Sequence, residues 1–228
     1  MQEIAGRIEP LRTKQAAAAR IPADTDSVPL FGHGTAIAAM VAGKTLGVAP
    51  KASIVHIKSN GTIKDYIEAI KDAYDHIEKR PERHRKSIVL LCSALGLGYE
   101  RTPAEELAPS TGYVRTAHVA IKKLLDFGVP VVQSAGNDAM EKDLHGHPRI
   151  NIDNFPALFE KGDKYPLIVV GSVDAYGNRC DDSQGGKRLT THAPGCDVST
   201  LAINGKVFQF DGTSLGKLYN SSIAPFQT

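Results

Sequence analysis

Three polar residues in glycine-rich contexts could together carry out acyl transfer. His33 lies in "FGHGTAIAAMVAG", between two glycines and ahead of small apolar residues. Asn137 lies in "SAGND", and Ser214 lies in "DGTSLG". A serine hydroxyl is a weak nucleophile until a base such as histidine removes its proton. An amide donor can then stabilise the oxyanion that forms, so these residue types suit nucleophilic catalysis on a carbonyl group.

The hydrophobic pattern places these residues where strands end and helices begin. Apolar runs and period-two alternation predict strands, and apolar residues at helical spacing predict helices. The predicted strands are 52–58, 87–94, 129–135, 167–173 and 206–210, and the predicted helices are 34–42, 63–79 and 113–128. Regions 137–165 and 174–200 are rich in Gly, Pro, Asp and Asn and are predicted to be loops. Asn137 and Ser214 each follow a strand, at the edge where α/β proteins place their sites.

The alternation of strands and helices predicts an α/β fold. We expect three layers, with a largely parallel central sheet and helices on both of its faces. The 228 residues include 27 basic and 25 acidic side chains, and no dense basic cluster suggests a nucleic-acid partner. No apolar stretch is long enough to predict a membrane span. The segment "GLGYER" lacks the third glycine of a dinucleotide fingerprint, which argues against a nucleotide site.

Cysteine and histidine spacing predicts no metal site. Cys92 lies in an apolar run and is expected to pack as a small hydrophobic residue. Cys180 and Cys196 lie in loop-like sequence and could form a disulfide, but the sequence does not decide this. His145 and His147 could suggest a metal, yet no third ligand follows at a suitable spacing.

Five motifs occur in an order that resembles the subtilisin-like serine peptidases, the subtilase family. They are "GHGTAIAAMVAG", "LGVAPKASIVHIK", "VVQSAGN", "HAPGCDVST" and "DGTS". The resemblance runs from Gly32 to Ser214 and implies a subtilisin-like fold, incomplete at both ends. It also implies a serine endopeptidase that hydrolyses peptide bonds in proteins through an acyl-enzyme.

The resemblance implies a role for each matching residue. His33 resembles the general base, Ser214 the nucleophile, and Asn137 the side-chain donor of the oxyanion hole. The residues that resemble the substrate-binding strand edge and pocket wall are Ser93, Ala94, Leu95, Gly96, Ser134, Ala135 and Gly136. An extended peptide would add to such an edge as a further strand. We expect protein or peptide substrates, a monomer and no cofactor; calcium occurs in the family, but no site is identified.

Both ends of the chain depart from the family pattern. The family places its catalytic aspartate after an apolar strand, well before the histidine, and no such strand is predicted ahead of His33. Asp24 and Asp26 are the nearest upstream acids, and both lack the strand and the following glycine. After the serine, the family has a helix of small residues. In this chain the expected small residues are replaced by Lys217, Tyr219 and Asn220. We expect these larger side chains to fit poorly into a buried helix.

These departures leave alternatives for the organisation and the activity. We expect a poorly defined segment over 1–30 and a partial peptidase domain over 31–228, as in a fragment, a splice product or an altered gene model. The alternative function is a catalytically impaired module that still binds peptides. Because the family is mostly secreted and this chain begins with neither a signal peptide nor a recognisable prodomain, the compartment stays open.

Overall fold

The computed structural model describes residues 8–10, 32–59, 62–92, 95–96, 112–143, 145–160 and 164–221. Helices and strands alternate along these residues, as the hydrophobic pattern predicts. In chain order they are β1 (Ile8–Pro10), α2 (His33–Ala42), β2 (Ile54–His56), α3 (Ile63–Glu78), the 3₁₀ helix η2 (Pro81–Lys86), β3 (Val89–Leu91), β4 (Leu95–Gly96), α4 (Gly112–Asp126), β5 (Val131–Ser134), β6 (Asn154–Phe155), the 3₁₀ helix η3 (Ala157–Phe159), β7 (Ile168–Val173), β8 (Thr191–Pro194), β9 (Val198–Leu201), β10 (Val207–Phe210) and α5 (Thr213–Ser221).

The chain divides into two compact units. The first comprises residues 1–58 and 199–209, and the second comprises residues 59–198 and 210–228. The chain therefore leaves the first unit after β2 and returns to it for most of the β9–β10 pair. The predicted base, His33, belongs to the first unit, whereas Asn137 and Ser214 belong to the second.

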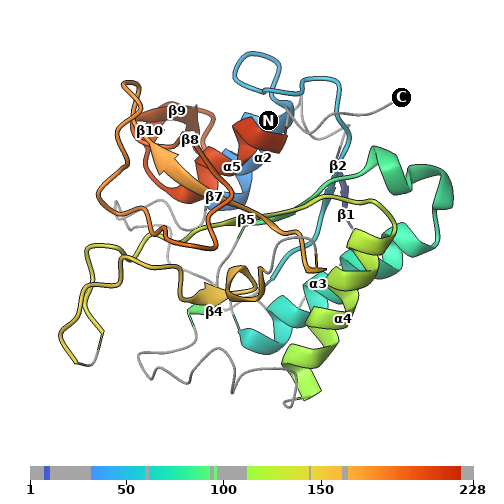
Figure 1. The fold of residues 1–228 in the computed structure, drawn as a ribbon. Coiled ribbons are helices and arrows are strands. Elements are labelled where there is room, and N and C mark those ends of the chain that lie inside the picture. The colour runs from blue at the N-terminus through green and yellow to red at the C-terminus, as the bar shows by residue number, and fades with distance from the viewer. Residues whose placement is uncertain are drawn as a thin grey trace. The chain divides into compact units, whose positions relative to one another are not determined.

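The second unit is built on a four-stranded sheet in the order β3-β5-β7-β8. All three pairs of neighbouring strands are parallel, so the four strands end at the same edge of the sheet. Figure 1 shows α3 and α4 lying side by side in this unit, where they pack against one another. The predicted fold class, a parallel sheet between layers of helices, is confirmed.

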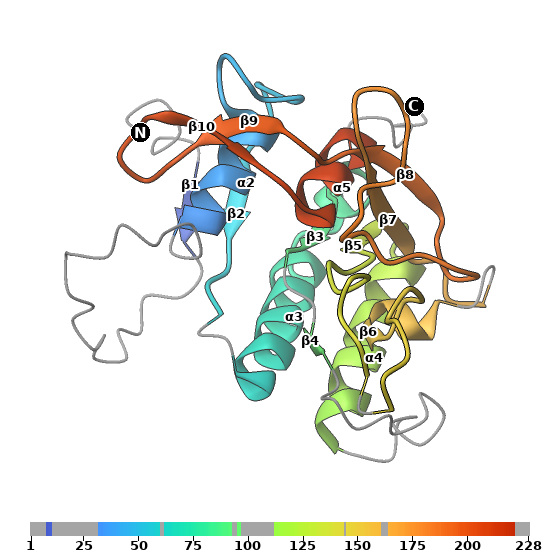
Figure 2. The same ribbon diagram turned by 90° about the vertical axis from the view of Figure 1, so that its left-hand side faces the viewer.

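Alternating valines explain why this sheet is covered on both faces. Val131 and Val169 belong to the large core cluster that includes the buried residues of α3 and α4. Their neighbours along the strands, Val132 and Val170, belong to a separate cluster with Ala193 of β8. Successive strand residues point to opposite faces, so one cluster lies on each face. The helix α5 packs against β5, β7 and β8, and Figure 2 shows it away from the side that α3 and α4 occupy.

Local signals mark the start of α3 and the end of α4. Thr62 caps α3, because its side chain accepts a hydrogen bond from the Asp65 N–H at 3.1 Å. Gly128 ends the α4 segment with φ = 73°, a backbone conformation that glycine adopts without a Cβ penalty. None of the helices in the described ranges combines the length and apolar character needed to cross a bilayer.

The first unit contains a short strand ahead of His33. Ile8–Pro10 forms β1 and pairs in parallel with β2. A strand of three residues that ends in proline is too short to show a periodic pattern. It is defined by its hydrogen bonds to β2, which the sequence does not reveal. In the same unit, α2 buries Ala36, Ala39 and Ala42, and Thr200 Oγ1 donates to the Ala36 carbonyl at 2.9 Å.

The two predicted loop regions contain further structure. Region 137–165 contains β6 and η3, and region 174–200 contains β8 and the start of β9. The prediction of loops there was wrong because β8, with the sequence "THAP", has no apolar run. It lies at the edge of the sheet and alternates exposed and buried residues only weakly. Its terminal proline is tolerated because an edge strand leaves one side unpaired.

The packing of α4 predicts unequal effects of two truncations on the same helix. Ile121 is fully buried, whereas Val119 is 44% exposed. Ile121→Ala should lower the free energy of unfolding by about 2–5 kcal/mol, because the lost contacts leave a cavity. Val119→Ala should change it by about 0.5 kcal/mol or less. Urea denaturation measures both values, and equal losses would contradict this placement of α4.

Candidate active site

The candidate site lies where the chain beyond β5 meets the start of α5. Asn137 Oδ1 accepts hydrogen bonds from the Thr213 N–H at 2.9 Å and from Thr213 Oγ1 at 2.7 Å. Thr213 Oγ1 in turn accepts from the Gly136 N–H at 3.3 Å. Because Thr213 immediately precedes Ser214, these three bonds hold the Asn137 side chain next to the predicted nucleophile.

The same bonds set which groups can donate at this site. Since the Asn137 oxygen is occupied by Thr213, its Nδ2 remains as a donor, and the residue is exposed. Ser214 is the second residue of α5, and the first N–H groups of a helix have no acceptor within it. The site can therefore present one side-chain donor and one backbone donor beside a largely buried serine, which is 9% exposed.

A tight turn positions the start of α5. The Gly212 N–H donates to the Gly195 carbonyl at 2.7 Å. A Cβ atom on Gly212 would lie 2.9 Å from Asn137 Nδ2, so the absence of a side chain lets the amide approach. The residue after Gly195 is Cys196, which forms a disulfide with Cys180 across a Cα–Cα distance of 6.3 Å. The structure thus assigns the pairing that the sequence left open, and the disulfide anchors the loop that contacts Gly212.

A backbone N–H group and a polar side chain hold the carbonyl groups of the segment Ala135–Gly136. The Gln184 N–H donates to the Gly136 carbonyl at 2.9 Å, and Asn154 Nδ2 donates to the Ala135 carbonyl at 2.5 Å. The Ala135 N–H donates to the Val170 carbonyl at 2.8 Å. Both N–H groups of Ala135 and Gly136 are therefore taken by the protein itself. This segment can form a wall of a binding site, but it offers a peptide no backbone donor.

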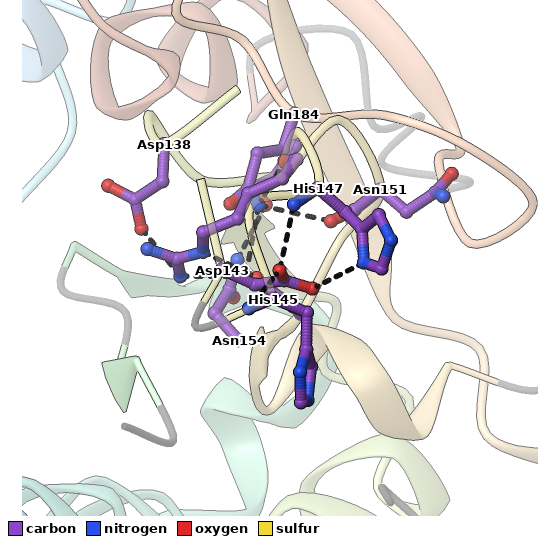
Figure 3. A network of polar contacts seen from close by, with 10 residues as sticks. Asp138, Asp143, His145, His147, Asn151, Asn154 and Gln184 are labelled. Carbon is purple, nitrogen blue, oxygen red and sulfur yellow. Dashed lines mark hydrogen bonds and ion pairs between the residues drawn. The ribbon is translucent and has the colours of Figure 1, made fainter. Parts of the chain in front are cut away.

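A wider network extends this support to the residue after Asn137. Figure 3 shows Gln184 reaching into the 138–154 loop, where its Nε2 donates to the Arg149 carbonyl at 2.8 Å and to Asp153 Oδ1 at 2.9 Å. The Arg149 guanidinium pairs with Asp138 at 2.9 Å and with Asp153 at 2.8 Å. Both flanks of Asn137 are therefore tied to the same loop.

The two loop histidines surround an aspartate that organises their turn. Asp143 Oδ1 accepts from the N–H groups of His145 and His147, each at 2.9 Å. His147 Nδ1 lies 3.5 Å from Asp143 Oδ2, as the dashed line in Figure 3 marks. Among the residues that the structure describes, no group of three or more His, Cys, Asp and Glu side chains is arranged to hold a metal ion. The aspartate thus has a conformational role in this turn.

The remaining predicted residues are placed as follows. His33 is the first residue of α2, as its motif predicts. Leu95 and Gly96 form β4, which pairs antiparallel with β6 so that Gly96 lies opposite Asn154. Ser134 is the last residue of β5 and is buried. Four residues named from the sequence lie outside the described ranges: Asp24, Asp26, Ser93 and Ala94.

Lys217 corrects the expectation that it would not fit into a buried helix. Its side chain is fully buried, and Nζ donates to the Leu91 carbonyl at 2.7 Å. Burial lowers the pKa of this amine, while an electrostatic interaction and a side-chain hydrogen bond with Cys92 act in the opposite direction. The lysine fits because its long apolar stem is enclosed and its end reaches a carbonyl at the end of β3. The side chains of Tyr219 and Asn220 lie outside the described part.

Several residues that build the site were not found from the sequence. The motif "DGTS" contains Thr213, the first residue of α5, but no role was predicted for its side chain. Asn154 and Gln184 carry no local signal, because their partners lie 19 and 31 to 35 residues away in sequence. Such contacts follow only from the folded arrangement of the loops.

Comparison with known proteins assigns the family. Residues 17–224 match the sequence model of the subtilase family. The chain belongs to this family of peptidases. It is 28% identical over 203 residues to a subtilisin-like protease of Coccidioides posadasii, covering 86% of this chain and 36% of that protein. It is 32% identical over 168 residues to subtilisin-like protease 2 of Trichophyton verrucosum, covering 72% of this chain and 33% of that protein. The chain thus spans about a third of these relatives.

Solved structures support the same fold. A cold adapted subtilisin-like serine proteinase superposes with a TM-score of 0.66 at 20% identity, covering 98% of this chain and 68% of that chain. The prenylagaramide maturation protease PagA superposes with a TM-score of 0.61 at 21% identity, covering 86% of this chain and 63% of that chain. These likenesses establish a subtilisin-like fold.

The close packing around Gly136 predicts a large effect of adding one methyl group. Gly136 has φ = 113°, and a Cβ atom there would lie 2.0 Å from Gln184 Oε1. Gly177 has φ = 86° but no atom within 4 Å of its Cβ position. Gly177→Ala should therefore cost about 1–2 kcal/mol from backbone strain alone. Gly136→Ala should cost at least about 1–3 kcal/mol more in urea denaturation, because it adds overpacking; equal costs would contradict the network described here.

The buried lysine predicts a pH-dependent stability. Because burial lowers the pKa of the Lys217 amine in the folded protein, the unfolded chain binds more protons between that value and about 10.4. The free energy of unfolding should therefore rise with pH through this window. Lys217→Met should be more stable than the wild type below the window, and the difference should shrink as pH rises. Thermal melts at several pH values measure this difference, with Lys187→Met as the control for removing an exposed lysine.

Proposed function

We propose that this chain is the catalytic part of a serine endopeptidase that hydrolyses peptide bonds in proteins through an acyl-enzyme. The observation that carries the proposal is the pair of hydrogen bonds from Thr213 to Asn137 Oδ1. They hold an amide donor beside Ser214, at the edge of the sheet where all four parallel strands end. Membership of the subtilase family supports the same assignment.

In the proposed reaction, each residue has one task. His33 removes the proton from Ser214 Oγ as this oxygen attacks the carbonyl carbon of the scissile peptide bond. The resulting oxyanion accepts hydrogen bonds from Asn137 Nδ2 and from the Ser214 N–H. The imidazolium then gives its proton to the leaving amine, and an acyl-enzyme remains on Ser214. Water, deprotonated by His33, hydrolyses this ester and restores the serine. The sequence of steps needs no cofactor.

The proposed substrate is an extended segment of a protein or peptide. Leu95 and Gly96 supply the strand edge, and Ser134, Ala135 and Gly136 supply the facing wall. The hydrogen bonds already made by Ala135 and Gly136 favour this division of roles, because their N–H groups are not available to a peptide. Main-chain pairing would therefore involve the Leu95 side of the site, while the wall would contact substrate side chains.

The second candidate is a peptide-binding module without catalysis. It is favoured by the sequence around Asp24 and Asp26, which does not match the aspartate motif of the family. An imidazole without its orienting carboxylate can lose about 10⁴-fold in turnover, the loss known for a serine protease with this residue changed. The module would keep the substrate wall and bind peptides without cleaving them.

Covalent labelling separates the two candidates. The 228-residue chain is incubated with a fluorophosphonate probe and, separately, with a quenched peptide library. The peptidase proposal predicts labelling that Ser214→Ala abolishes, together with release of peptide fragments. A folded chain that binds peptides but is neither labelled nor active would establish the second candidate instead.

The oxyanion role predicts a selective loss of turnover. Asn137→Ala should lower kcat by about 10²–10³-fold, the loss known for removing the corresponding donor from subtilisin, with a much smaller change in KM. Asn178→Ala changes an asparagine on an exposed turn and should leave both constants unchanged. Steady-state kinetics on one peptide substrate measures both variants. An Asn137→Ala enzyme with normal kcat would refute the assigned role.

A further inference from the structure

The helix α5, which contains Ser214 near its start, carries a buried lysine about one turn later. Among the residues that the structure describes, Lys217 is the one lysine or arginine whose side chain is buried. Residues three apart on a helix lie on neighbouring positions of one face, so Ser214 and Lys217 share a rigid support. The flanking residues Leu215 and Leu218 are also fully buried, which holds this helix firmly against the sheet.

The amine of Lys217 bonds to the strand that leads into the proposed substrate edge. Its Nζ donates to the carbonyl of Leu91, the last residue of β3, at 2.7 Å. From Leu91 the chain continues through Cys92 towards Leu95 and Gly96, which form β4. The hydrogen bond from Lys217 to Leu91 thus joins the helix of Ser214 to the segment before the proposed substrate edge, across a sequence separation of 126 residues.

Few ionisable groups lie near the amine of Lys217 in the described part of the structure. Among the residues that the structure describes, the ionisable groups near it are the thiol of Cys92 and, next to that thiol, the buried phenol of Tyr66. The strands packed against α5 add the neutral side chains of Gln133 and Ser172, which are buried. No carboxylate among the described residues pairs with Lys217. In such apolar surroundings, a hydrogen bond to a carbonyl is stronger than in water.

We propose that Lys217 is a positioning residue, which sets the spacing between Ser214 and a bound peptide by tying α5 to the end of β3. The proposal rests on the peptidase function proposed above. Lys217 does not touch the substrate and acts through the strand that binds it. Displacing a reacting group by about 1 Å can cost about 10²-fold in rate, so the loss of this bond should affect catalysis far more than folding.

Variants that remove the donor but keep the volume test this role. Lys217→Met and Lys217→Leu should lower kcat by at least about tenfold, with a smaller change in KM and no fall in melting temperature. Lys217→Gln keeps a donor on a slightly shorter chain and should recover part of the lost kcat. Leu218→Met, on the same buried helix, should leave kcat unchanged. Rates are normalised to the concentration of active sites.

The outcomes distinguish this proposal from the peptidase proposal. If the wild-type chain is active and the two donor-free variants keep kcat within about twofold, the positioning role is overturned and the peptidase assignment stands. Activity that falls only in step with melting temperature, or failure of both donor-free variants to fold, would also overturn it, because the bond would then serve folding. A wild-type chain that neither cleaves peptides nor reacts with a fluorophosphonate would overturn both proposals.

Discussion

One side-chain oxygen, Asn137 Oδ1, connects the two segments on which the candidate site depends. It accepts two hydrogen bonds from Thr213, whose hydroxyl also accepts from Gly136. An amide that uses its oxygen in this way has a fixed orientation, so its nitrogen has a fixed direction as well. A donor aimed in advance stabilises developing charge without having to reorganise during the reaction. The remaining parts of the second unit can be understood as support for this contact.

The parallel sheet provides that support because it brings separate segments to one edge. The segment after β5 carries Asn137, and the turn before α5 is bonded to Gly195, which follows β8. Cores on both faces of the sheet hold β5 and β7 in place. Above the sheet, Gln184 and Asn154 occupy the backbone carbonyls of Gly136 and Ala135. Rigidity at the site therefore comes from the buried strands β5 and β7 and from the hydrogen-bonded segments that contain Asn154 and Gln184.

The sequence predicted those parts of the fold whose pattern is local. The stripes of α3 and α4 and the apolar runs of β5 and β7 are visible in windows of a few residues, and all four elements were found. Edge strands were harder, because β8 is half exposed and β1 is only three residues long. Their existence depends on hydrogen bonds to partners elsewhere in the chain, and composition carries little trace of them.

The same distinction applies to the site. Asn137 and Ser214 could be proposed as site residues because short motifs surround them, whereas no role was predicted for Thr213. Lys217 was expected to be a misfit because sequence shows the cost of burying an amine but not the carbonyl that receives it. The Leu91 carbonyl belongs to the backbone, and since every residue has such a group, the sequence does not indicate which one will accept the hydrogen bond. Backbone acceptors are for this reason the part of a site that sequence analysis detects least.

The order of elements along the chain has a consequence for the timing of assembly. Ser214 follows all four strands of the parallel sheet, and its neighbours bond to residues 76 and 126 positions earlier. Contacts of such long range form late, since a large loop must close before they can contribute. During synthesis, the sheet, α3, α4 and the asparagine are all made before the nucleophile helix exists. A nascent chain therefore lacks the complete candidate site until α5 has docked.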